Sequence, residues 1–209
     1  VGCAEAWLRY SRIEGIADRD EVVRGDEVVL CTTGEGTTSE GEFWEALNTA
    51  CNLKLPVLFL VEDNGYAISV PVDVQTAGGN VATLVKNFPN LYWVGEINGS
   101  DPVESYGILK EAVAHCRARK GPAFVRALVT RPYSHSMSDD ESKYRSKAER
   151  ETEAQKDCIR TFGRYLIEEG ILDDAGIERL HEEIATEVRA AAESAQTSPQ
   201  PPRDSVTEF

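Results

Sequence analysis

Two short polar segments, each directly after a run of apolar residues, carry the residue types that could do chemistry in this chain. The first is Gly34–Gly36, with the sequence Gly-Glu-Gly, and the second is Asp63–Ser69, which begins Asp-Asn-Gly-Tyr. Glu35 and Asn64 offer hard oxygen ligands, and only one of them is charged. A site with so few protein charges suits a Mg²⁺ or Ca²⁺ ion that also binds phosphate oxygens. The alternative is structural, a tight strand-to-helix turn in the first segment and an ordinary Asn-Gly turn in the second.

The residues around both segments predict a β-α-β unit that would bring them together. Residues 27–33 and 56–62 are short, nearly continuous apolar runs, which are typical of buried parallel strands. Residues 39–53 have apolar side chains at helical spacing, and Ser39 and Glu42 are placed to form a capping box at the helix start. Because open α/β sheets bind ligands at the carboxyl ends of their strands, we expect the two polar segments to share one site.

Alternating elements continue along the chain. We expect a helix over 80–88, a strand over 91–94, a helix over 101–119 and a strand over 122–130. Two more helices, over 146–169 and 173–195, carry apolar stripes, and the Pro-rich segment 196–209 is expected to be a linker or tail. The pattern predicts an α/β fold with a doubly wound parallel sheet, helices on both faces and additional C-terminal helices, in one domain over 1–195.

Three segments, in this order and spacing, resemble the α subunit of the E1 component of 2-oxo acid dehydrogenase complexes. They are Gly34–Gly41, Asn64–Ser69 and His135–Asp140. The first two are similar to the thiamine diphosphate motif, in which Gly-Asp-Gly is followed by a closing Asn-Asn. The resemblance covers roughly residues 1–190 and departs from the broad motif at Glu35, where Asp is usual, and at Asp63, where Asn is usual.

The resemblance implies the thiamine diphosphate-binding fold and a site for thiamine diphosphate and Mg²⁺. In the family pattern, the metal would be held by the side chains of Glu35 and Asn64 and by the backbone carbonyl of Tyr66. Asp63 is not expected to be a ligand. The residues assigned to cofactor binding are Gly34, Glu35, Gly36, Asn64, Tyr66, Ala67, Ile68 and His135.

His135 lies in a polar segment after the last predicted strand, where a lone histidine is more often a solvated surface residue. In the family, the matching histidine contacts the cofactor diphosphate and assists acyl transfer to lipoyl, and imidazole suits that work because its pKa lies near the working pH. We therefore expect His135 to be catalytic. Arg131, Tyr144 and Arg145 are expected to anchor this loop, with Arg145 available to pair with Asp139 or Asp140; the alternative is a solvated run of charges.

The implied activity is that of a thiamine diphosphate-dependent E1 enzyme, which decarboxylates a 2-oxo acid and reductively acylates a lipoyl group on the E2 acyltransferase. The expected partner is an E1 β subunit or a fused β region, in an α2β2 assembly or a dimer of fused chains. That partner would carry the glutamate that activates the aminopyrimidine. Alternatives are another thiamine diphosphate enzyme, such as an acetoin dehydrogenase or a transketolase-like protein, and a non-catalytic assembly fragment. The sequence does not distinguish between the possible 2-oxo acid substrates. Ser136 lies at the position that is phosphorylated in regulated members of the family, but the sequence does not show whether a kinase modifies it.

Composition argues against other classes of partner and site. The net charge of −14 over 209 residues disfavours nucleic acid and anionic membranes, which attract clustered Lys and Arg. No apolar run approaches the roughly 20 residues that span a bilayer. The cysteines show no paired spacing, so we expect reduced core residues: Cys3, Cys31, Cys51, Cys116 and Cys158. These features predict a cytoplasmic enzyme, or one of the mitochondrial matrix in a eukaryote. Because the chain begins within an apolar helix and without Met, we expect it to be a fragment.

Overall fold

The computed structural model describes residues 1–15 and 25–207, which fall into two compact units, Val1–Cys158 and Ile159–Phe209. The first unit contains, in chain order, α1 (Gly2–Tyr10), β1 (Val29–Gly34), η1 (Glu35–Ser39), α2 (Gly41–Leu53), β2 (Val57–Asp63), β3 (Tyr66–Ala67), β4 (Val70–Pro71), α3 (Val72–Gln75), η2 (Ala77–Gly79), α4 (Val81–Val85), β5 (Trp93–Asn98), α5 (Pro102–Arg117), β6 (Ala123–Leu128), η3 (Glu141–Lys143) and α6 (Lys147–Ala154). Helix α7 (Cys158–Glu168) follows, and then come α8 (Asp174–Thr197) and η4 (Arg203–Thr207). The expected boundary between a domain over 1–195 and a linker or tail over 196–209 stays a prediction.

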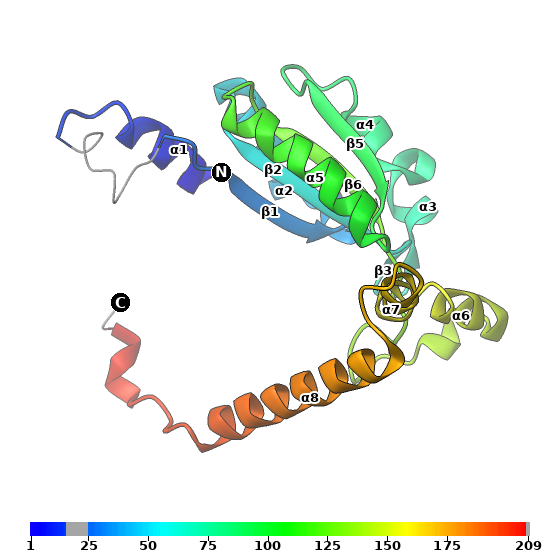
Figure 1. Cartoon of the computed structure of the whole chain (residues 1–209). Coiled ribbons are helices and arrows are strands. Elements are labelled where there is room, and N and C mark those ends of the chain that lie inside the picture. Colours follow the sequence, from blue (N-terminus) through cyan, green and yellow to red (C-terminus); the bar gives the residue numbers. More distant parts are fainter. Residues whose placement is uncertain (16–24, 208–209) are drawn as a thin grey trace. The chain divides into compact units, whose positions relative to one another are not determined.

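A parallel sheet forms the centre of the first unit. Within the described residues it has four strands in the order β1-β2-β6-β5 (Figure 1). Gly34 lies opposite Glu62, and Asp63 lies opposite Leu128, so the carboxyl ends of three neighbouring strands meet at one edge of the sheet. The predicted α/β class with a parallel sheet is confirmed.

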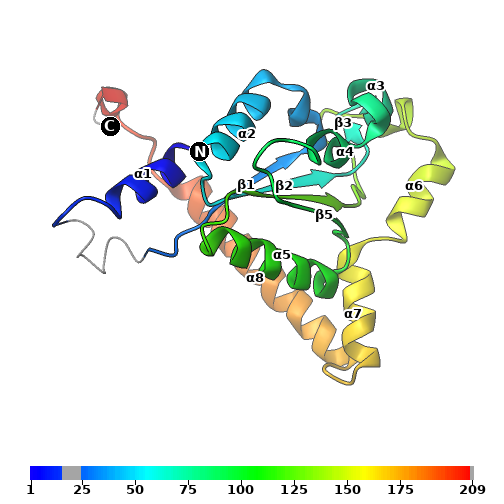
Figure 2. The same cartoon turned by 90° about the horizontal axis from the view of Figure 1, so that it is seen from above.

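Side chains of the inner strands alternate between two apolar layers, as the period of two in a strand requires. Phe59 and Phe124 pack on one face with residues of α2 and α4, whereas Leu58 and Val125 pack on the other face with residues of α5. Figure 2 shows α2 and α4 on one side of the sheet and α5 on the other. This double cover explains why β2 and β6 consist of almost continuous apolar residues.

Strand β1 is less buried than its sequence predicts. Leu30 is 57% exposed and Cys31 is also exposed, because β1 lies at an edge of the sheet and pairs, among the described residues, with β2 alone. The expectation that all five cysteines belong to the core is therefore wrong. Cys51 and Cys116 are buried, whereas Cys3 and Cys158 are exposed.

The predicted helix starts are partly right. Helix α2 begins at Gly41, not Ser39, and its N-cap Glu40 makes no side-chain capping bond, so the capping box is wrong. Ser39 belongs to η1, and its hydroxyl instead lies 3.2 Å from Oε1 of Gln75. Helix α5 starts close to the predicted residue 101, because the carboxylate of Asp101 caps it by accepting from two backbone N–H groups of the first turn.

The C-terminal helices also differ from expectation. The helix predicted over 146–169 is two helices, because α6 ends at Ala154 and α7 begins at Cys158. Helix α8 starts where expected, with the Asp173 side chain accepting from the N–H of Gly176 at 2.7 Å. No helix in the described parts of the chain is both long and apolar enough to cross a membrane.

Candidate functional site

Glu35 and Asn64 meet at the carboxyl edge of the sheet. Glu35 opens η1 immediately after β1, and Asn64 follows β2 directly. The backbone N–H of Asn64 donates to Oε2 of Glu35 at 3.2 Å, and the hydroxyl of Thr38 donates to the Glu35 carbonyl at 2.6 Å. The two side chains expected to bind metal are thus neighbours.

Two oxygen atoms of this pair are buried without a hydrogen-bond partner among the described residues: Oε1 of Glu35 and Oδ1 of Asn64. Burial raises the pKa of Glu35, which is 1% exposed, although the N–H of Asn64 and the charge of Arg131 lower it. Buried polar atoms normally have partners, because leaving them unpaired costs free energy. A hard cation that takes carboxylate and amide oxygens would fit both atoms.

No group of three or more His, Cys, Asp or Glu side chains in the described residues could hold a metal ion. The expected ligand set does not need one, since it combines one carboxylate, one amide and one carbonyl with phosphate oxygens and water. That chemistry suits Mg²⁺, which usually keeps few protein ligands.

Gly36 permits the close approach of η1 to β3. A Cβ atom at this position would lie 2.7 Å from the Cβ of Ala67 and 3.2 Å from its Cα, too close for any other residue without a backbone shift. At Gly34, a Cβ would meet only the carbonyl oxygen of Glu62, at 3.9 Å. Of the two glycines in the motif, Gly36 is therefore the one that the backbone packing requires.

Tyr66, Ala67 and Ile68 continue the edge of the site. Ile68 has a positive φ of 57°, and its carbonyl accepts from Nη1 of Arg131 at 2.7 Å. The guanidinium of Arg131 lies 5.7 Å from the ring centroid of Tyr66, and the phenol of Tyr66 donates to Glu149 at 2.8 Å. The side chain of Tyr66 thus anchors the turn, while the role of its carbonyl as a metal ligand stays a prediction.

The loop that carries His135 is tied down through a short chain of contacts. Arg131 donates to the hydroxyl of Tyr144 at 2.8 Å, and this hydroxyl donates to Oδ2 of Asp139 at 2.5 Å. The same oxygen accepts from the backbone N–H of His135 at 2.9 Å. His135 is exposed, and within the described residues no hydrogen bond or ion pair joins it to Glu35 or Asn64; Arg131 links its loop to the site.

Arg145 is a loop anchor, but its expected ion pair is wrong. It is 4% exposed and pairs with Glu141 at 3.0 Å and with Glu149 at 3.3 Å, four residues away on either side. Asp140 instead caps η3, accepting from the N–H of Ser142. Arg145 also donates to the carbonyl of Arg131 at 3.0 Å, so one predicted arginine anchor holds the backbone of the other.

Sequence reasoning missed Arg126. Its Nε donates to Oδ2 of Asp63 at 2.7 Å, directly beside the proposed metal ligand Asn64. A signal was present, because Arg126 is the one charged residue in the otherwise apolar β6. A lone charge in an inner strand needs a partner, and the carboxylate that ends the neighbouring strand supplies it.

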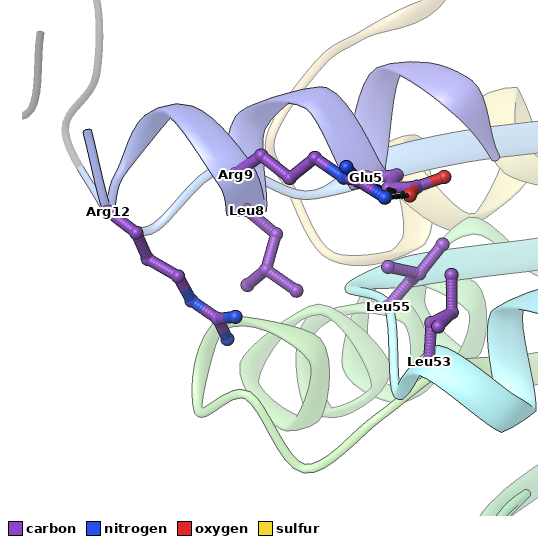
Figure 3. Close-up of a pocket in the computed structure, with 6 residues that line it drawn as sticks. All are labelled: Glu5, Leu8, Arg9, Arg12, Leu53 and Leu55. Carbon is purple, nitrogen blue, oxygen red and sulfur yellow. Dashed lines mark hydrogen bonds and ion pairs between the residues drawn. The ribbon is translucent and has the colours of Figure 1, made fainter.

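A cavity of about 340 Å³ lies away from this site, lined by Glu5, Leu8, Arg9, Arg12, Leu53 and Leu55. Figure 3 shows Leu8 of α1 facing Leu53 and Leu55. Because Leu55 precedes β2, the cavity lies toward the amino ends of the strands, whereas Glu35 and Asn64 lie at the carboxyl ends. It is separate from the candidate site.

The model of the family described as dehydrogenase E1 component matches residues 6–204. The chain belongs to the dehydrogenase E1 component family. It is 34% identical over 211 residues to the 2-oxoisovalerate dehydrogenase subunit alpha of Bacillus subtilis, a match that covers 100% of this chain and 63% of that protein. It is also 34% identical over 175 residues to the pyruvate dehydrogenase E1 component subunit alpha of Acholeplasma laidlawii, covering 83% of this chain and 50% of the relative.

A third E1 relative is the 3-methyl-2-oxobutanoate dehydrogenase subunit alpha of Mycobacterium tuberculosis, 33% identical over 166 residues, with 78% of this chain and 43% of that protein covered. The resemblance to E1 α subunits is therefore confirmed. The chain spans between 43% and 63% of the length of these relatives.

Proposed function

We propose that this chain is the α part of a 2-oxo acid dehydrogenase E1 enzyme that uses thiamine diphosphate and Mg²⁺. The observation that carries the proposal is a pair of oxygens at the carboxyl edge of a parallel sheet, Oε1 of Glu35 and Oδ1 of Asn64, which are buried and have no hydrogen-bond partner in the part of the chain that the structure describes. Family membership supports it, and the proposal extends to the doubly wound thiamine diphosphate fold.

The residues of this chain would bind and orient the metal ion and the cofactor. Glu35, Asn64 and the carbonyl of Tyr66 would hold Mg²⁺, and the backbone of Gly34, Gly36, Ala67 and Ile68 would line the cofactor. Bound thiamine diphosphate supplies the carbanion chemistry that decarboxylation needs. The Cβ-free surface of Gly36 keeps η1 against β3, and Arg131 holds the carbonyl of Ile68, so the backbone is shaped before any ligand arrives.

His135 would hold or deliver a proton at the acyl-transfer step, from a loop anchored by Asp139 and Tyr144. No residue of this chain takes the role of the glutamate that activates the aminopyrimidine; we assign that residue to an E1 β subunit or fused β region. The further partners are a 2-oxo acid and the lipoyl group of E2, in an α2β2 assembly or a dimer of fused chains in the cytoplasm. The relatives are named for 2-oxoisovalerate, pyruvate and 3-methyl-2-oxobutanoate dehydrogenases, so a 2-oxo acid is the substrate class that they support.

Thermal unfolding of the assembled α and β parts tests this proposal. Thiamine diphosphate with Mg²⁺ should raise the unfolding temperature, because a ligand that binds only the folded state stabilises it. The same addition should leave the unfolding temperature of a Glu35→Ala variant unchanged. Equal unfolding temperatures of the unmodified assembly with and without cofactor would favour the non-catalytic assembly fragment. Turnover with pyruvate, branched-chain 2-oxo acids and acetoin would then identify the substrate.

A further inference from the structure

A buried ion pair lies directly behind the turn that presents Asn64 and Tyr66. Arg126 donates Nε to Oδ2 of Asp63, and Oδ1 of Asp63 accepts from the backbone N–H of Gly65 at 2.9 Å. The side chains of Asp63 and Arg126 are 2% and 11% exposed. Asp63 is therefore held at both oxygens, one by an inner strand and the other by the turn itself.

The ion pair continues outward across the sheet. Nη1 of Arg126 donates to Glu96 at 2.7 Å, and these two residues lie opposite each other on β6 and β5. Glu96 also accepts from the side-chain amide of Asn80 at 3.0 Å, and Asn80 caps α4. The guanidinium uses separate nitrogens for its two carboxylates, a geometry that the single ammonium group of lysine does not reproduce.

We propose that Arg126 is a positioning residue for the metal site, which it controls through Asp63. By fixing Asp63, Arg126 fixes the turn over residues 63–66, so that Oδ1 of Asn64 and the carbonyl of Tyr66 face Glu35. This inference rests on the proposed function, because it assigns a role toward the metal of that same site.

The charge balance gives a second reason for the assignment. Asp63 carries a negative charge in the position next to Asn64 and is buried, so without Arg126 it would lack an ionic partner in the described structure. Such a carboxylate would either rotate toward water, pulling the turn with it, or bind the cation itself. The first response displaces Oδ1 of Asn64, and the second changes the set of ligands around the cation. In this chain, Asp63 and Arg126 thus form one unit.

The test measures Mn²⁺, a paramagnetic substitute for Mg²⁺, by electron paramagnetic resonance in the holoenzyme assembly with thiamine diphosphate. The variants are Arg126→Gln, Asp63→Asn and the double variant. Loss of a group that orients a metal ligand typically weakens metal affinity about 10–100-fold, and we expect this loss for Arg126→Gln. The double variant should recover most of the affinity, because no charge is left buried without a partner.

Arg119→Gln is the matched control. Arg119 is also a partly buried arginine, but it donates to the carbonyls of Gly25 and Glu27 before β1, at the other end of the sheet. This variant should lower the unfolding temperature without changing Mn²⁺ affinity. If Arg126→Gln does not fold, Arg126→Lys takes its place and should show a loss that Asp63→Asn relieves.

The outcomes separate the inference from the function on which it rests. Absence of Mn²⁺ binding to the unmodified holoenzyme would overturn the proposed function itself. If the unmodified protein binds Mn²⁺, an affinity of Arg126→Gln within about twofold of it would overturn the positioning role. A loss of equal size with and without Asp63→Asn would also overturn it, because Arg126 would then act by another route.

Discussion

Asn64 donates its backbone N–H to one carboxylate oxygen of Glu35 across 3.2 Å, and the other carboxylate oxygen is buried with no hydrogen-bond partner in residues 1–15 and 25–207. The hydrogen bond ties the ends of β1 and β2 together. Hydrogen bonds to both carboxylate oxygens would stabilise the cofactor-free chain, but they would leave neither oxygen available to bind a cation. The geometry therefore exchanges some stability for readiness to bind metal.

Glu35→Gln should stabilise the cofactor-free protein while abolishing Mg²⁺ and cofactor binding. Burial raises the pKa of Glu35 above its ordinary 4.5, so its favourable contribution to folding is present below that pH and is lost as pH rises through the raised value. The advantage of Gln should therefore grow as the pH rises from 4.5 through the raised pKa of Glu35. We expect roughly 2–4 °C in unfolding temperature, which corresponds to roughly 1 kcal/mol in a chain of this size. A variant less stable than the unmodified protein at high pH would contradict this.

Gly36→Ala should lower both stability and cofactor affinity. The added methyl group would lie 2.7 Å from the Cβ of Ala67, so η1 and β3 must separate; overpacking of this kind typically costs about 1–3 kcal/mol. Gly107→Ala in α5 is the control, since its Cβ would meet no atom within 4 Å and Ala favours helix by about 1 kcal/mol. Chemical denaturation should thus move in opposite directions for the two variants, and parallel shifts would show that packing at Gly36 is unimportant.

Tyr144→Phe should loosen the loop that holds His135. The hydroxyl both accepts from Arg131 and donates to Asp139, and the loop around it has few other buried groups. Limited proteolysis between residues 133 and 146 should be faster in the variant. In the unmodified assembly of α and β parts, it should slow when thiamine diphosphate is added. Cutting rates that respond neither to the substitution nor to the cofactor would count against this anchor.

His135→Ala should separate the two halves of the proposed reaction. If the imidazole serves acyl transfer, reductive acylation of lipoyl should fall about 10²–10⁴-fold, whereas decarboxylation measured with an artificial electron acceptor should fall much less. If the imidazole mainly positions the diphosphate, both rates should fall together. Met137→Ala is the control in the same loop, because Met137 is fully exposed. Full activity of His135→Ala in both assays would make it a bystander.

The sequence predicted most of the elements because burial patterns are local. Apolar residues mark β2 and β6 on both faces, and Asp101 marks the start of α5. The sequence failed where partners come from distant segments: Arg126 finds Asp63 only after β6 inserts beside β2, and the residues of β1 look buried although the strand lies at an edge. Likewise, the sequence predicts that Arg145 anchors the loop but not which carboxylates it pairs with, because that choice depends on the geometry of η3 and α6 rather than on spacing.

The position of β1 has a practical consequence for anyone who purifies this chain alone. Its outer backbone groups have no partner strand among the described residues, and Leu30 and Cys31 add an apolar, oxidisable surface beside them. Unprotected strand edges recruit other chains, so the isolated polypeptide should self-associate as its concentration rises, and thiol oxidation should make part of that association covalent. Light scattering with and without a reductant would detect both processes. The measured self-association would then depend on β1, the strand that precedes Glu35.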